Sequence, residues 1–137
     1  VKLDHIIYMQ RGYVAAERSG EGEEAKTVQI DHTQCRLGKW YYEGYGKAHF
    51  SATPAYRALE EPHRRVHSGV RAAIELARQN WLRDATILDG IIENMRQAES
   101  ASQEVIRLIG EMVRQKYGGS SSPGAAVGSP SRRASAV

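Results

Sequence analysis

The sequence predicts an all-α protein, a four-helix bundle with a short additional helix, and three kinds of observation favour this class. Apolar side chains recur at spacings of three and four residues over long stretches, which places them on one face of a helix. Prolines and capping side chains stand where these stretches begin, and glycines stand where they end. No stretch alternates apolar and polar residues between hairpin turns, so strands are not expected.

The N-terminal part of the chain is expected to form two of the helices. The first covers Lys2–Glu17 and is followed by a polar, glycine-rich loop at Arg18–Ala25. The second covers His32–Tyr42, where Asp31 at the cap and Gln34 three residues later approximate a capping box. The apolar side of the first helix carries Leu3, Ile6, Tyr13 and Ala16.

The remainder of the chain predicts a short helix and two long ones. Thr53 caps the short helix, Pro54–Leu59, and a second proline opens the helix Pro62–Asn80. The last helix ends after Lys116, because two glycines follow shortly. Its apolar seam has the spacing of a helix packed in a bundle, with one serine as a polar interruption. The seam consists of Leu88, Ile91, Met95, Ala98, Ser102, Val105, Ile109 and Met112.

The length and the charge of the chain indicate how many domains it has and what it can bind. The chain has 137 residues and a formal net charge of +3, which suits one small domain. A low-complexity tail, residues 118–137, is expected to be disordered, and residues 1–117 are expected to form the helical domain. Two of the positive charges, Arg132 and Arg133, lie in that tail. The near-neutral body therefore argues against nucleic acid as a partner.

Cellular location is indicated by what the sequence lacks. Its apolar runs fall short of the roughly 20 residues that a membrane span needs, and no signal-peptide pattern opens the chain. The single cysteine, Cys35, has no partner for an intramolecular disulfide. We therefore expect a cytoplasmic protein that does not enter the membrane.

A histidine pair gives the first indication of a metal site. His63 and His67 are four residues apart on a predicted helix, so both imidazoles point the same way. They share their face with the apolar Val66 and Val70 and so face the interior of the bundle. The helix dipole in the first turn after Pro62 would keep both rings neutral. Taken alone, such a pair is a weak signal for a metal, and hydrogen-bonded core histidines or exposed ones are the favoured alternatives.

Cys35 and His5 strengthen the metal hypothesis. Cys35 is expected in the second turn of its helix, and His5 lies one turn into the first helix, so both approach the same end of the bundle. Three imidazoles and one thiolate form a tetrahedral donor set that suits Zn²⁺. A closed set of this kind favours zinc over copper.

The candidate ligands and the last helix lie in four distinctive stretches, LDHIIYMQ, DHTQCRLGKWYYEGYG, PHRRVH and AESASQEV. Together these stretches resemble the chemoreceptor zinc-binding domain, a bacterial sensory module, and the resemblance extends over residues 1–116. The family pattern has a histidine in the first helix, a C-x-x-G-x-W segment and an H-x-x-x-H pair. The resemblance therefore implies His5, Cys35, His63 and His67 as the zinc ligands.

The resemblance also implies a function without catalysis. We expect a zinc-binding sensory domain of a soluble chemoreceptor in chemotaxis, acting as a homodimer, with its signalling output domain upstream of Val1. The signal is zinc itself or oxidation of the cysteine ligand. One alternative is control of a diguanylate cyclase, and another is a structural helical adaptor. A metal hydrolase is disfavoured, because four protein ligands leave no position for a reactive water.

Other polar residues near the predicted ligands have less specific interpretations. His32 stands three residues before Cys35 and competes with it as a candidate ligand, although the family pattern gives it no such role. His49 is expected in a loop, facing solvent. Asp4 and Asp31 are candidates to accept an imidazole N–H, with a helix cap as the favoured role of Asp31.

Overall fold

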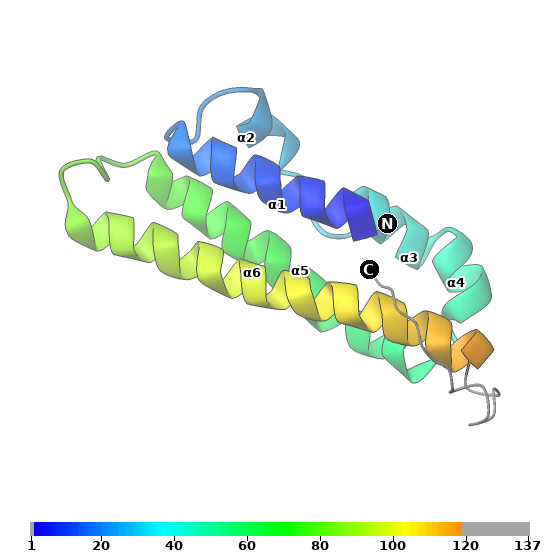
Figure 1. Cartoon of the computed structure of the whole chain (residues 1–137). Coiled ribbons are helices and arrows are strands. Elements are labelled where there is room, and N and C mark those ends of the chain that lie inside the picture. The colour runs from blue at the N-terminus through cyan, green and yellow to red at the C-terminus, as the bar shows by residue number, and fades with distance from the viewer. Residues whose placement is uncertain (1, 119–137) are drawn as a thin grey trace.

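The computed structural model describes residues 2–118 and confirms the all-α class, because these residues form helices and no strand. Three helices are long and three are short (Figure 1). The tail that the sequence predicts to be disordered lies, from residue 119 on, outside the described residues. The helices are α1 (Lys2–Glu17), α2 (Glu23–Thr27), α3 (Arg36–Tyr42), α4 (Tyr45–Phe50), α5 (Pro54–Ala77) and α6 (Ala85–Val113), followed by a π-helical turn, η1 (Arg114–Gly118).

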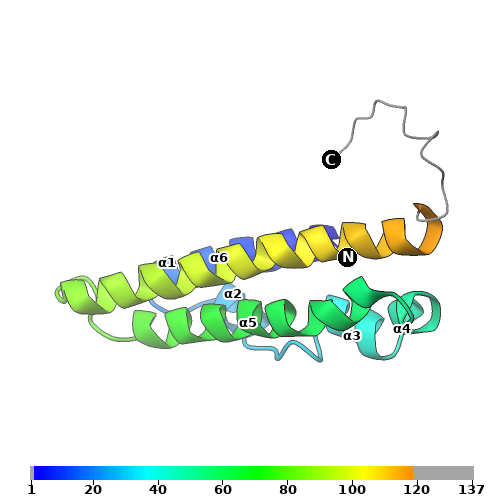
Figure 2. The ribbon, with the colours of Figure 1, turned by 90° about the horizontal axis from the view of Figure 1, so that it is seen from below.

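Helices α5 and α6 form a long antiparallel pair, which is the largest packing unit of the fold (Figure 2). Asp84 caps α6, since its carboxylate accepts the Thr86 N–H at 2.9 Å. The predicted seam of α6 is buried from Ile91 to Met112, and Leu88 at its start is half-buried. The sequence pattern therefore identified the face of α6 correctly.

Helix α1 packs against both long helices, but of the four residues predicted on its apolar side only Ala16 is buried. Leu3, Ile6 and Tyr13 are exposed. The buried face combines small residues with three larger ones, and a Cβ on Gly12 would come within 3.0 Å of Val70 Cγ1. Close approach of the helices at Gly12 explains why this face is buried instead of the one that carries Leu3 and Ile6. The buried residues of α1 are His5, Tyr8, Met9, Gly12, Ala15 and Ala16.

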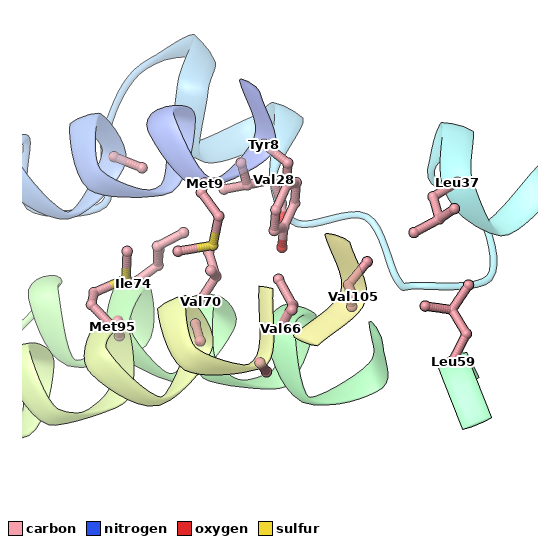
Figure 3. Close-up of a cluster of buried hydrophobic side chains, with 14 of the residues drawn as sticks. Tyr8, Met9, Val28, Leu37, Leu59, Val66, Val70, Ile74, Met95 and Val105 are labelled. Atoms are coloured by element: carbon pink, nitrogen blue, oxygen red, sulfur yellow. The ribbon is translucent and has the colours of Figure 1, made fainter. Parts of the chain in front are cut away.

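One core joins these helices. Side chains from α1 and from the segment after α2 lie against side chains of α5 and α6, and Leu37 of α3 lies near Leu59 at one end (Figure 3). The labelled core residues are Tyr8, Met9, Val28, Leu37, Leu59, Val66, Val70, Ile74, Met95 and Val105.

The two helices predicted at Pro54–Leu59 and Pro62–Asn80 are one helix, so the expected break before Pro62 is wrong. Thr53 caps α5, accepting the Tyr56 N–H at 3.3 Å. Pro62 has no N–H to offer the preceding turn, but Leu59 and Val66 on either side of it are fully buried. Packing of these side chains thus keeps the helix continuous at Pro62. The histidine pair therefore lies well inside α5, away from the positive N-terminal end of the helix dipole.

The helix predicted at His32–Tyr42 begins later, at Arg36, and the predicted cap and capping box are wrong. Asp31 Oδ1 instead accepts the Thr33 N–H and the Thr33 hydroxyl, both at 2.6 Å. This side-chain turn competes with helix formation. Cys35 is therefore the N-cap of α3 and does not lie in its second turn.

Two predicted loops are partly helical. The glycine-rich loop ends in α2, and the segment that carries His49 belongs to α4. His49 is nevertheless exposed, as predicted, and its ring stacks on Tyr45 at 3.8 Å between centroids. Within residues 2–118 no helix has the length and apolar character needed to cross a membrane.

Candidate metal centre

Three buried histidines converge between α1 and α5. His5 comes from α1, and His63 and His67 come from successive turns of α5. Each is only 2% exposed, and each offers a ring nitrogen within 4.8 Å of those of the other two. The ring centroids of His5 and His63 are 5.1 Å apart, and those of His63 and His67 are 5.0 Å apart. The structure thus brings the three predicted histidines together.

Two of these histidines have a buried nitrogen that no group among residues 2–118 satisfies. His67 Nδ1 lies 3.0 Å from the Ile30 carbonyl oxygen, which can only accept, so this nitrogen carries the proton. The Nε2 atoms of His5 and His67 are buried and have no hydrogen-bond partner in the described part of the chain. A buried acceptor without a partner is costly. A metal ion at this point would satisfy both nitrogens, so the donor set fits a metal.

The serine in the α6 seam belongs to this site. Ser102 is buried, and its hydroxyl lies 3.5 Å from His5 Nδ1. It and the Ile30 carbonyl are placed to orient the histidine rings from behind, as outer contacts of metal ligands do. Sequence reasoning recorded Ser102 only as an interruption and did not find Ile30. Asp4, predicted for such a role, forms an ion pair with Arg36 at 3.3 Å.

Cys35 lies beside the histidines, although the group of mutually close donor atoms among the described residues consists of the three histidine nitrogens and does not include its sulfur. Its Sγ lies 3.3 Å from His63 Nε2 and accepts the Gly38 N–H, also at 3.3 Å. The thiol is half-buried, and burial raises its pKa, with the Gly38 N–H acting in the opposite direction. A metal ion would favour the thiolate. Three imidazoles and one sulfur are donors that zinc accepts in four-coordinate sites.

Gly38 is required for the position of Cys35. A Cβ at residue 38 would lie 2.1 Å from the His32 carbonyl oxygen and 2.7 Å from the Thr33 carbonyl carbon. Only glycine therefore allows the first turn of α3 to pack against the turn that precedes it. The C-x-x-G spacing in the sequence has this physical cause.

The environment keeps the histidines neutral. Burial lowers the pKa of His5 to about 4, and that of His67 to about 4. Burial and the neighbouring imidazoles lower the pKa of His63 to about 2. Neutral rings retain the lone pairs that a metal needs. Burial, and not the helix dipole expected from the sequence, is the cause.

The metal-free protein is expected to lose stability as the pH falls from about 7 to about 4. In the unfolded chain these histidines take up protons near pH 6.5, whereas in the folded chain His5 and His67 do so only near pH 4. The free energy of unfolding should therefore fall as the pH falls, by about 1.4 kcal/mol per pH unit for each fully titrating histidine. Urea denaturation at several pH values measures this slope. His49→Ala, at an exposed histidine, should leave it unchanged. A flat profile would contradict the prediction.

The fold and the centre define a helical-bundle domain that is built to hold a metal ion. Comparison with known families is consistent with this class. The family model of the chemoreceptor zinc-binding domain matches residues 5–74, which is 70 of the 137 residues, and the chain belongs to this family. The matched stretch includes His5, Cys35, His63 and His67. Neither the curated proteins nor the solved structures include a match to the chain.

Membership of this family identifies the metal and the general role of the domain. Zinc is the cofactor, and the buried histidines described above are its possible ligands. The family is sensory and zinc-binding and is not a catalytic one.

Proposed function

We propose that residues 1–117 form a zinc-responsive sensory domain of a bacterial signalling protein, with His5, Cys35, His63 and His67 as the four zinc ligands. The observation that carries this proposal is the pair of buried Nε2 atoms, on His5 and His67, that lack a partner in the described residues. The Cys35 sulfur beside His63 supports the fourth position. When bound, zinc supplies a positive charge that the four donors share.

Regulation is expected to act on α1. His5 is the candidate ligand on this helix, whereas α5 holds two. Helix α1 has far fewer neighbours in α5 and α6 than these two helices have in each other. Whether His5 Nε2 is engaged should therefore decide how firmly α1 is held, which makes α1 the two-state element of a sensor.

The output that we propose is that of a cytoplasmic chemotaxis receptor, in which the domain acts as a homodimer. The description of the family as a chemoreceptor domain supports this output over control of a diguanylate cyclase. Tyr13 of α1 and Ile92 of α6 are exposed and line one surface cavity, and they support a surface that a second copy covers.

Access to the cysteine supports two possible inputs. A cavity of about 540 Å³ opens beside the site, and its lining includes His5, Cys35 and His67. A small oxidant or chelator can reach the sulfur through this cavity, so the signal is either the zinc level or oxidation of Cys35.

The metal content of the purified, untagged protein tests the proposal. We expect about one zinc per chain, and we expect His63→Ala and His67→Ala to abolish stoichiometric zinc, because each removes one of two ligands on the same helix. His49→Ala is the matched control, since this histidine is exposed on α4. Elemental analysis after gel filtration gives the ratio. Equal zinc in the wild type and in His67→Ala would rule out the proposed ligand set.

A further inference from the structure

A fourth imidazole lies beside the candidate zinc ligands. The ring of His32 is 5.6 Å from that of His63 and 6.4 Å from that of His67, measured between centroids. The corresponding distances from His5 are 5.1 and 6.1 Å. His32 is thus almost as close to the histidine pair of α5 as the proposed ligand on α1. The family match does not by itself give this residue a role.

The backbone of His32 is fixed at the rim of the centre. Its carbonyl oxygen lies 3.6 Å from Cys35 Sγ and packs against the first turn of α3 at Gly38. The side chain of His32 is only 16% exposed, so the ring is directed into the molecule. The residue belongs to a turn and not to a helix, so rotation of its side chain breaks no helical packing.

The present orientation of the ring keeps its nitrogens out of the donor group. His32 Nδ1 lies 3.8 Å from the Asp31 carboxylate. The group of mutually close nitrogens among the described residues consists of those of His5, His63 and His67. Cys35 already occupies the position next to His63 Nε2, and a thiolate is a stronger zinc ligand than a neutral imidazole. His32 therefore lies next to the site without being needed while the sulfur is present.

We propose that His32 is a reserve zinc ligand, which takes the place of Cys35 when its thiolate is not available. This inference rests on the proposed function and extends it. Exchange of a thiolate for a neutral imidazole leaves four donors, and the released sulfur takes up a proton. The site then carries one more unit of positive charge, without loss of the metal. The domain would thus have a third state, distinct from both the cysteine-ligated and the metal-free forms.

A double-mutant cycle on the full chain tests this inference. Zinc affinity is measured by competition with a chelator for the wild type, His32→Ala, Cys35→Ala and the double variant. In the wild-type background we expect His32→Ala to change the affinity by less than about twofold. In the Cys35→Ala background the same substitution should weaken it about tenfold or more. Equal effects of His32→Ala in the two backgrounds would overturn the inference.

The ligand itself can be observed directly. In Cys35→Ala loaded with zinc, the ring-nitrogen shifts of ¹⁵N-labelled His32 should become those of a metal-bound imidazole, whereas in the wild type they should not. Unchanged His32 shifts in Cys35→Ala would also overturn the inference. Helical circular dichroism checks folding, and His32→Gln replaces His32→Ala if the latter does not fold. A wild type that binds no zinc would refute the proposed function as well, so the two failures are distinguishable.

Discussion

Removal of zinc from the loaded protein should increase amide hydrogen exchange in α1 while leaving the pair of α5 and α6 protected. Helix α1 exposes Leu3, Ile6 and Tyr13, and of its buried residues only Tyr8 and Met9 are large and apolar. Little apolar area therefore holds it without the metal. Around His5 we expect exchange to rise by about tenfold or more, since local opening then costs at least about 1.4 kcal/mol less.

Amides in α6 provide an internal control for the exchange experiment. Amides in the middle of α6, around Val105, lie in the fully buried seam and should exchange at the same rate with and without zinc. His67→Ala, measured without added chelator, should reproduce the exchange pattern of the metal-free wild type. If exchange near His5 does not respond to the metal, zinc is a passive structural ion and the sensory mechanism proposed for α1 is wrong.

Gly38→Ala should be the most damaging single methyl addition to the candidate site. The new Cβ would overlap backbone atoms of His32 and Thr33, which cannot move aside as a flexible side chain can. We expect a loss of about 3 kcal/mol or more in the free energy of unfolding. Displacement of Cys35 should weaken zinc binding at the same time. Chemical denaturation and chelator competition measure the two effects.

Gly110→Ala is the matched control for this substitution. Gly110 also lies within a helix, but its added Cβ would meet only the ends of flexible side chains, Lys2 Nζ at 3.4 Å and Arg114 Nη1 at 3.7 Å, which are ordinary contact distances. Alanine is the better helix former, so this variant should be neutral or more stable by up to about 1 kcal/mol. A similarly mild result for Gly38→Ala would show that the turn before α3 can shift without cost.

The part of the fold that the sequence predicts well is the part governed by one strong periodicity. In α6 the apolar seam alone identifies the buried face. In α1 the same logic fails for Leu3, Ile6 and Tyr13, because close approach at Gly12 turns the face with Tyr8 and Met9 toward the core. At Pro62, burial of the flanking side chains outweighs a local signal for a helix start. In both places tertiary packing determines the structure, and tertiary contacts cannot be read directly from a single sequence.

The sequence likewise predicts some features of the candidate site and not others. The four-residue spacing of His63 and His67 suffices to place their rings together. Their meeting with His5 and Cys35 was predicted from a rough register and from the family resemblance, since nothing local specifies it. The Asp31 turn, which shifts Cys35 to the cap of α3, has the same residue types as a capping box. The backbone acceptor at Ile30 carries no side-chain signal at all.

The buried histidines stand at positions 5, 63 and 67, and this separation along the chain has a consequence for folding. The pair on α5 forms with its own helix, whereas His5 joins it only after a long stretch of chain has been closed into a loop. Such closure costs entropy before any contact compensates for it, so non-local contacts of this kind form late. The complete metal centre therefore forms only when α1 has docked on α5, and a partly folded chain lacks it.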